Sequence, residues 1–573
     1  MAADALSSVA TLRRSAGVDL SLPILAATAA ILVLLIGMPI GWLVYYAVTD
    51  LAGSPTVANF VTLASDSAFT EPLLTTLILS GGVSISAVLV ASPIAWLVAR
   101  TDFPARRTIR VLMMASFVTP PFLGAVAWEI LAAPNSGILN GWWRDLTGSA
   151  TPLFDIYSLP GLIFVISCYT APYVFVLVAN ALDRIPADLE DAAGIFGAGP
   201  WRTAITVTVP LVMPAILAGA LIAFLQAMTL FGSPAILALP AGFHTVTTKI
   251  FSLFQYPPKP QLAAAAALPL LAITVLLLGV QARITGQRSY TVIGGKSGEP
   301  RLIRLGWLRP LASALVFGAL ALPLFLPYAA LLKTAVSTFP GAAVTLENLT
   351  WRHVHFVFVD FSQTQKAFWN TLILALGTAT IGTLLALIIA YLTARRATSG
   401  FRVLEFLATA PIAIPGVVLG VGLYLTYTQP PLMLYGTLWI LLFAFLTIEL
   451  PSAFQQLRAS FRSIHPELEE ASRILGATRL WTLARITTPL LKSGVVAAWC
   501  FIFIGVVREL SAAVMLFTAP TKVLSVVIYD LNESGDLGAI AVLGTAMLLI
   551  TFVVVGFANW VSGVGSGVRL RGG

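Results

Sequence analysis

Apolar segments long enough to cross a lipid bilayer recur along the whole of this 573-residue chain. Hydrophobic residues make up 58% of the sequence and charged residues only 10%, whereas soluble domains carry about 25% charged residues. A spanning helix needs about 20 apolar residues, and about twelve segments meet that length: 22–48, 73–99, 109–132, 156–182, 209–238, 261–282, 310–334, 370–393, 403–427, 436–457, 489–518 and 539–561. They are too long for barrel strands, so helices must satisfy the backbone. The sequence predicts an all-α polytopic membrane protein.

The lysine and arginine residues indicate how these helices are oriented. With a cytoplasmic N-terminus, 25 of the 33 basic residues fall in cytoplasmic loops and tails, as the positive-inside rule requires. Twelve crossings then place both termini in the cytoplasm. The net charge of +8 reflects this topology. We expect no nucleic-acid partner, because the basic residues are dispersed over many loops instead of forming one patch.

A short pattern occurs twice, 279 residues apart, in two predicted cytoplasmic loops at 186–210 and 465–489. Each copy has an acidic residue, two small residues, a glycine and a later proline: Asp191, Ala192, Ala193, Gly197 and Pro210, then Glu470, Ala471, Ser472, Gly476 and Pro489. Carboxylates suit the positive end of a helix, and glycine permits a sharp bend into a second short helix. The loops are predicted to be helix–turn–helix units.

This pattern is similar to the EAA motif of the membrane subunits of bacterial ABC importers. The resemblance implies a loop that docks on an ATPase subunit, with these coupling residues: Glu190, Asp191, Ala192, Ala193, Gly197, Glu469, Glu470, Ala471, Ser472 and Gly476. Two copies imply a fused permease that binds two ATPase subunits. Asp191 departs from the family, which usually has glutamate there. A shorter carboxylate can still accept a charged hydrogen bond.

The repeat extends beyond the loops and divides the chain into two transmembrane domains. We predict a first domain at 1–285, a cytoplasmic linker at 286–308 and a second domain at 309–573. Six crossings in each half give two parallel repeats, which is the type I ABC importer fold that the resemblance implies. The linker contains Gly295-Lys296-Ser297 but lacks the earlier glycine of a phosphate-binding loop. We therefore expect no enzyme activity and no bound cofactor in this chain, with ATP and Mg²⁺ held by the partner ATPase.

Polar residues inside predicted crossings are candidates for the transport pathway, because charge within a bilayer is costly. The candidates are Glu129, Gln226, Gly232, Ser233, Arg508 and Glu509. An equally weighted alternative is that Arg508 and Glu509 pair within the helices and hold the fold. Glu449 is interpreted as a carboxylate near the inner end of its helix. No catalytic residues and no metal-binding set are predicted.

Several stretches, including Thr119-Pro120-Pro121-Phe122-Leu123-Gly124 and Arg508-Glu509-Leu510-Ser511, resemble the fused permeases of Fe(III) importers. The resemblance implies a bacterial inner-membrane protein that receives Fe(III) from an extracytoplasmic binding protein. Thiamine, polyamine and (amino)phosphonate are alternative substrates within the same class. A twelve-helix secondary transporter driven by an ion gradient is the alternative from another class. The paired loops and the lack of a buried carboxylate chain argue against it.

Overall fold

The computed structural model describes residues 21–286, 302–341, 345–395, 400–465 and 467–565. Within these ranges all regular elements are helices, and the β-bridges are three isolated residue pairs. The helices of the first half are α2 (Ser21–Leu32), η1 (Val33–Gly37), α3 (Met38–Ala47), α4 (Ala58–Ser65), α5 (Ser67–Arg100), α6 (Arg106–Val118), α7 (Pro121–Ala132), α8 (Ile138–Thr147), α9 (Leu159–Asp183), α10 (Ala187–Ile195), α11 (Pro200–Thr203), η2 (Ala204–Thr208), α12 (Val209–Thr229), α13 (Gly232–Leu237), α14 (Val246–Ser252) and α15 (Pro260–Gly286).

The second half repeats this order after the predicted linker, of which residues 287–301 lie outside the described residues. Its helices are η3 (Gly306–Leu308), α16 (Arg309–Leu320), η4 (Ala321–Phe325), α17 (Leu326–Ala335), η5 (Leu346–Asn348), α18 (Arg352–His355), η6 (Phe356–Asp360), α19 (Ser362–Ala394), α20 (Phe401–Thr409), η7 (Ala410–Ala413), α21 (Gly416–Tyr427), α22 (Leu438–Arg462), α23 (Glu467–Ile474), α24 (Arg479–Thr482), η8 (Leu483–Thr487), α25 (Thr488–Leu490), α26 (Lys492–Arg508), α27 (Ala513–Leu516), η9 (Ala519–Thr521), α28 (Leu524–Glu533) and α29 (Leu537–Gly565).

The all-α membrane architecture is confirmed, but not every predicted crossing is one straight helix. Among the described residues, nine helical segments are long and apolar enough to span a bilayer, and three bent pairs raise the number to 12. The predicted crossings 109–132 and 403–427 are each two helices, which meet at bends of 96° and 112°. The backbone is extended before and at Pro120, and again at Ile414 before Pro415. Proline causes these breaks because it disfavours helical angles in the preceding residue.

Two further predicted crossings end earlier than expected. The crossing predicted at 209–238 stops at Thr229, and α13 is a separate short helix. The crossing predicted at 489–518 stops at Arg508, and its N-terminal part bends by 66° between α25 and α26. Residues 230–231 and 509–512 therefore interrupt helices within the membrane domain. Backbone N–H and C=O groups at these breaks lack helical partners and can form hydrogen bonds with side chains.

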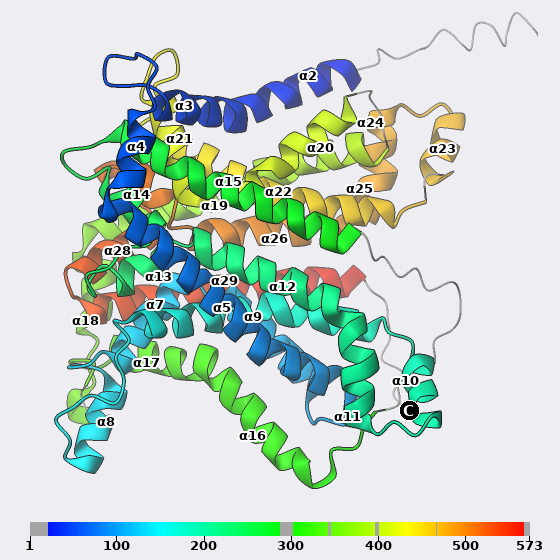
Figure 1. Ribbon diagram of the computed structural model, residues 1–573. Helices are drawn as coiled ribbons and strands as arrows, with labels where there is room; N and C mark the ends of the chain where they lie inside the picture. Colours follow the sequence, from blue (N-terminus) through cyan, green and yellow to red (C-terminus); the bar gives the residue numbers. More distant parts are fainter. Residues whose placement is uncertain (1–20, 287–301, 342–344, 396–399, 466, 566–573) are drawn as a thin grey trace, which may run out of the picture.

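The first crossing of each half packs against the other half (Figure 1). α3 lies against α21, and the Tyr427 hydroxyl donates to the carbonyl of Leu34 at 2.6 Å. α17 lies against α7, where Thr119 and Tyr328 share a hydrogen bond of 2.5 Å. One large apolar core cluster includes residues from both halves. The halves are thus interlocked, and the domain boundaries read from the sequence stay a prediction.

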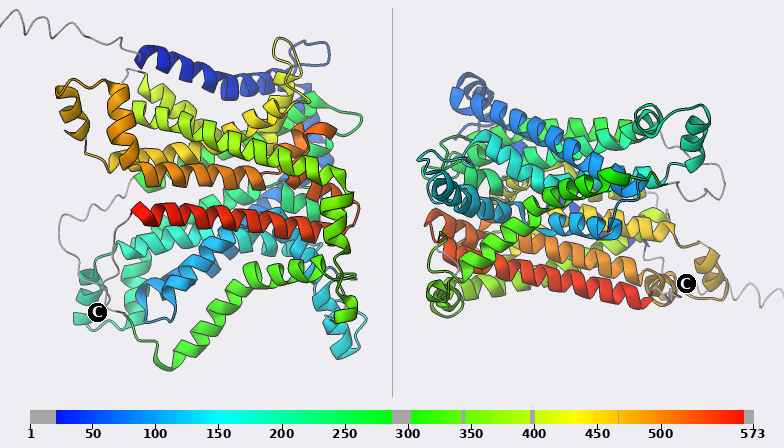
Figure 2. Two further views of the ribbon diagram at one scale, coloured as in Figure 1. Left: turned by 180° about the vertical axis from the view of Figure 1, so that it is seen from behind. Right: turned by 90° about the horizontal axis from the view of Figure 1, so that it is seen from below.

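The short helices gather at the two ends of the bundle. Figure 2 shows the bundle from behind and from below, with long helices running between the two ends. α10, α11, α23 and α24 lie at one end, which we call the loop-bearing face, whereas α4, α8, α14, α18 and α28 lie at the other (Figure 1). Both pattern loops are therefore on the same face.

Candidate functional site

The two pattern loops are folded as matched helix–turn–helix units. α10 and α23 each end just before a glycine with a left-handed backbone, Gly197 at φ 81° and Gly476 at φ 88°. After each turn the chain hydrogen-bonds back to its helix, from Ala198 to Ala193 and from Ala477 to Ser472. Left-handed angles favour glycine. The bend expected from the sequence is present in both copies.

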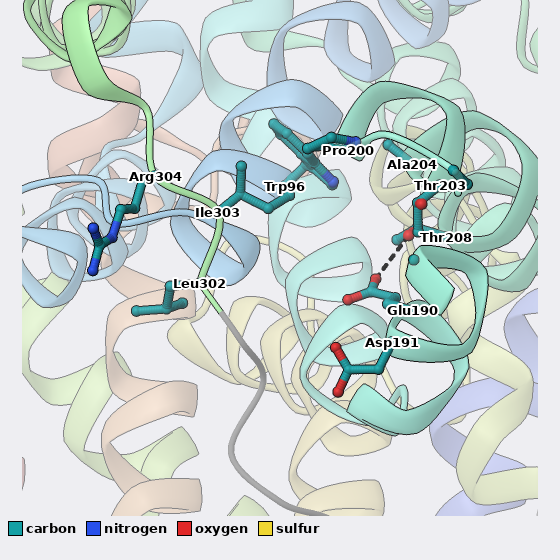
Figure 3. A pocket seen from close by; sticks show the side chains of 12 residues that line it. Trp96, Glu190, Asp191, Pro200, Thr203, Ala204, Thr208, Leu302, Ile303 and Arg304 are labelled. Carbon is teal, nitrogen blue, oxygen red and sulfur yellow. Dashed lines mark hydrogen bonds between the residues drawn. The ribbon is translucent and has the colours of Figure 1, made fainter. Parts of the chain in front are cut away.

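A buried arginine holds the first loop to the bundle. Arg100, at the end of α5, donates from Nε to Glu190 Oε1 at 3.0 Å and from Nη2 to the Leu182 carbonyl at 2.8 Å. Its side chain is only 1% exposed. The Thr208 hydroxyl donates to the same oxygen of Glu190 at 2.7 Å (Figure 3). The Nη1 of Arg100 is buried and has no hydrogen-bond partner among the described residues. Through Nε, Nη2 and the Thr208 hydroxyl, the triad ties α10 to the end of α5 and to η2.

The second loop is held by the corresponding three residues. Arg395 donates from Nε and Nη2 to Glu469 Oε1 at 3.1 and 3.0 Å, and the Thr487 hydroxyl donates to that oxygen at 3.1 Å. We call these two sets the anchor triads. Glu190 and Glu469 were predicted from the sequence as coupling residues, and the structure directs both into the bundle. Their contacts position the loops.

The other predicted coupling residues divide between exposed and buried positions. Those exposed on the loop-bearing face are Asp191, Ala192, Gly197, Glu470, Ala471 and Gly476, while Ala193 is half-buried. Ser472, also predicted as a coupling residue, is buried and shares a 2.9 Å hydrogen bond with Thr482. Its contact joins α23 to α24 and leaves no surface for a partner.

Exposed apolar side chains precede each turn glycine. Ile195 and Phe196 in the first loop, and Ile474 and Leu475 in the second, are between 85% and 90% exposed. They occupy equivalent positions in the repeat, and we call these four residues the apolar knobs. None of the four is among the coupling residues predicted from the sequence, which are carboxylates, small residues and glycines. The available signal was an apolar pair directly before the glycine in both copies.

A cavity of about 690 Å³ lies beside the first loop. Glu190 and Asp191 line one side, and Leu302, Ile303 and Arg304 line the other (Figure 3). The latter segment is fixed by backbone pairing, because the amide of Ile303 donates to the Arg100 carbonyl at 2.9 Å. The end of the linker thus packs beside an anchor triad.

Among the predicted pathway residues, Arg508 joins the two halves at the centre of the bundle. Its Nη1 donates to the carbonyl of Phe117 at 2.8 Å, and its guanidinium lies 5.3 Å from the centroid of the Phe117 ring. α6 ends at Val118, so the Phe117 carbonyl lacks a helical partner. The negative end of a helix also favours a cation. The break between α6 and α7 therefore creates the acceptor for Arg508.

Aromatic and amide groups surround this contact. The Phe117 ring packs edge-on against Tyr173 at a centroid separation of 5.0 Å and lies 6.5 Å from Phe501. Gln226, another predicted pathway residue, donates to the Tyr173 hydroxyl at 2.7 Å. We call Phe117, Tyr173, Gln226, Phe501 and Arg508 the central latch. It connects α6, α9 and α12 of the first half with α26 of the second.

Glu449 is buried and Glu509 is half-buried near Arg508. Glu509 follows the last residue of α26, and its Oε1 accepts the amide of Ala512 at 3.1 Å. Glu449 lies midway along α22 and packs against Gly505 of α26. The interpretation of Glu449 as a helix-end carboxylate is wrong. Both carboxylates interact electrostatically with the guanidinium of Arg508, which balances part of their buried charge.

Gly232 and Ser233, two of the predicted pathway residues, contact the start of α7. The Ser233 hydroxyl donates to the Pro121 carbonyl at 2.9 Å, and a Cβ at Gly232 would lie 2.6 Å from Phe122. These residues attach the start of α13 to α7.

Glu129 joins the halves at the end opposite the loops. It accepts hydrogen bonds from the Tyr157 hydroxyl at 2.7 Å and from Asn532 of the second half at 2.9 Å. Burial, followed by the charge of Glu129, raises the pKa of Tyr157. The phenol therefore stays protonated as the donor. The three residues form a cross-half joint.

Comparison with known proteins identifies relatives for most of the chain. A family model described as "Binding-protein-dependent transport system inner membrane component" matches residues 87–287 and 382–563. The ferric transport system permease protein FbpB of Actinobacillus pleuropneumoniae is 26% identical over 530 residues, which cover 89% of this chain and 76% of that protein. The Fe(3+)-transport system permease protein FbpB 2 of Haemophilus influenzae is 23% identical, over 91% of this chain and 95% of that protein. The molybdenum transport system permease protein ModB of Escherichia coli K12 is 27% identical, over 38% of this chain and 98% of that protein.

Proposed function

This chain belongs to the family of binding-protein-dependent transport system inner membrane components, and on that premise we propose that it is the fused permease subunit of an ATP-driven ABC importer. The two matched loops carry this proposal. Each is pinned by an anchor triad and presents exposed apolar knobs on the same face of a membrane bundle. Two equivalent surfaces suit a pair of ATPase subunits. ATP and Mg²⁺ then belong to those subunits, and this chain contributes no catalytic group.

The translocation pathway in this proposal runs between the two halves and is closed at the central latch. Arg508 comes from the second half, and its acceptor at Phe117 comes from the first. Movement of the halves driven by the coupling loops therefore makes or breaks this contact. The anchor triads supply the mechanical connection, because they tie α10 and α23 to the ends of α5 and α19, which cross the membrane.

The proposal places both termini and the loop-bearing face in the cytoplasm. The opposite loop at 50–71 contains Asp50, Asp66 and Glu71 but no lysine or arginine, the charge asymmetry of an outer loop. In a background with Cys168 and Cys500 replaced by alanine, an impermeant maleimide applied to intact cells is expected to label Ser65→Cys and not Ser463→Cys. Both positions are exposed. Labelling of Ser463→Cys alone would reverse the orientation.

We propose ferric iron as the substrate, delivered by an extracytoplasmic binding protein. The support is the extended match to two permease proteins whose names state ferric transport. Thiamine, polyamine and (amino)phosphonate are the alternatives within the same class.

Uptake by reconstituted vesicles tests function and substrate separately. Vesicles that contain the permease, its ATPase and the cognate binding protein are expected to accumulate labelled ferric iron only with ATP. An ATPase variant unable to hydrolyse ATP is the control. ATP-dependent uptake of another substrate without iron uptake would reject iron and retain the importer. Uptake driven by an ion gradient without the ATPase would instead establish a secondary transporter.

A further inference from the structure

A polar cavity of about 330 Å³ lies at the loop-bearing ends of three helices of the second half. It is formed by the end of α19, the start of α20 and the end of α22, through Thr393, Ala394, Phe401, Arg402, Glu405, Arg458 and Arg462. Three arginines therefore face one carboxylate in a small space. The excess of positive charge indicates that the cavity favours an anion.

Two of these three arginines have no carboxylate partner among the described residues. Arg458 pairs with Glu405. Within the described part of the chain, neither Arg402 nor Arg462 forms an ion pair with a carboxylate. Unpaired guanidinium groups that share a cavity repel each other, so a bound anion would stabilise this arrangement. The planar guanidinium fork is well suited to phosphate oxygens.

The corresponding corner of the first half has a different ion pair. Its α6 and α9 align with α20 and α22 along their lengths, so that Arg110 corresponds to Glu405 and Asp183 to Arg462. Arg110 forms two hydrogen bonds with Asp183, at 2.8 and 2.9 Å. The second half has the reversed charges at these positions, but they do not form the equivalent pair.

One additional arginine explains the difference. Arg458 replaces Ala179 of the first half and takes Glu405 as its partner. Arg462 therefore lacks the ion pair with Glu405 that would be equivalent to the Arg110–Asp183 pair of the first half. The grouping of three arginines around this cavity is thus a feature of the second-half sequence.

The surface next to the cavity is apolar. Val403 and Phe406, on the same short helix as Arg402 and Glu405, are 59% and 68% exposed. Their helix is the first part of the bent apolar pair Phe401–Ala413 and Gly416–Tyr427, which is apolar enough to cross a bilayer, so acyl chains would contact the two exposed side chains. A basic cavity that opens beside a lipid-facing surface combines the two features of a phospholipid-binding site.

We propose that this cavity binds the phosphate headgroup of an anionic phospholipid, with Arg402 and Arg462 as the phosphate ligands. Thr393 and Ala394 of the cavity directly precede Arg395 of the second anchor triad. A bound headgroup therefore contacts the same helix end that holds the second coupling loop.

Native mass spectrometry of the purified full-length chain tests the proposal. Wild-type protein from membranes rich in phosphatidylglycerol and cardiolipin is expected to retain anionic lipid, and Arg402→Gln with Arg462→Gln to lower retention about tenfold or more, because two charged hydrogen bonds are lost. Arg106→Gln with Arg107→Gln removes two positive charges from the equivalent corner of the first half and is expected to have no effect. Arg402→Lys with Arg462→Lys keeps the charge and is expected to give intermediate retention.

The remaining outcomes decide against the site. Equal retention by wild type and by the Arg402→Gln, Arg462→Gln variant, with both unfolding at the same temperature, would overturn it. Millimolar inorganic phosphate is the competing source of the same chemistry. If phosphate stabilises the wild type against unfolding and added phosphatidylglycerol does not, the ligand is a free phosphate and the lipid proposal fails. These measurements require neither ATPase nor substrate, so they are independent of the proposed transport function.

Discussion

Replacing Phe196 and Leu475 together with aspartate is expected to abolish association with the ATPase. Both side chains are almost fully exposed in the chain alone, so their loss should leave folding unchanged. Burial of one such side chain contributes about 1.5–3 kcal/mol. Two substitutions are therefore expected to weaken ATPase binding by at least about 100-fold. Co-purification with a tagged ATPase, and ATP hydrolysis stimulated by the binding protein, measure this effect.

Leu51→Asp with Leu346→Asp is the matched control. These leucines are 91% and 90% exposed, one in each half and away from the pattern loops. The control should retain the ATPase. Normal ATPase association in the Phe196→Asp, Leu475→Asp variant would remove the pattern loops from the docking surface. A variant with Gly197→Val and Gly476→Val tests the same loops by changing their backbone. Valine disfavours the positive φ angles of these two positions, so the turns should be distorted and ATPase association weakened.

The sequence was sufficient to predict the membrane class, the repeat and the glycine turns, because each depends on local composition or on a fixed spacing. It was not sufficient for the bends near Pro120 and Pro415. Hydropathy records that a run is apolar and not whether its two parts are collinear, so two short helices were read as one crossing. The packing of α3 on α21 is also invisible to local patterns, because it depends on contacts between residues hundreds of positions apart.

In the coupling loops, too, the sequence predicts the helix but not which of its side chains face the bundle. Glu190 and Asp191 are adjacent acidic residues, and the sequence predicted one role for both. On a helix, neighbouring side chains point about 100° apart, so one can face the bundle while the other faces solvent. Only the position of Arg100, 90 residues earlier in the chain, decides that Glu190 is the inward one.

Replacing Arg508 with alanine is expected to release the central latch and raise ATP hydrolysis in the absence of the binding protein. The substitution removes a charged hydrogen bond to the Phe117 carbonyl and a cation–π contact with its ring. In the proposed mechanism these contacts exist only while the pathway is closed. A hydrogen bond to a charged group contributes about 1.5–3 kcal/mol. Loss of that amount shifts the closed-to-open equilibrium by about tenfold or more. The rate of hydrolysis by the assembled complex without binding protein measures the shift.

Two companion variants separate the latch from simple loss of charge. Glu449 is buried and Glu509 is half-buried beside Arg508, so alanine at 508 leaves both carboxylates without their cation. Adding Glu449→Gln removes part of that penalty and should restore stability while hydrolysis stays high. Arg508→Lys retains the cation but not the guanidinium geometry, and an intermediate rate is expected. If Arg508→Ala folds normally and hydrolyses ATP at the wild-type rate, the cross-half contact does not hold the pathway closed. Arg508 would then serve only to balance the buried carboxylates, which is the alternative that the sequence left open.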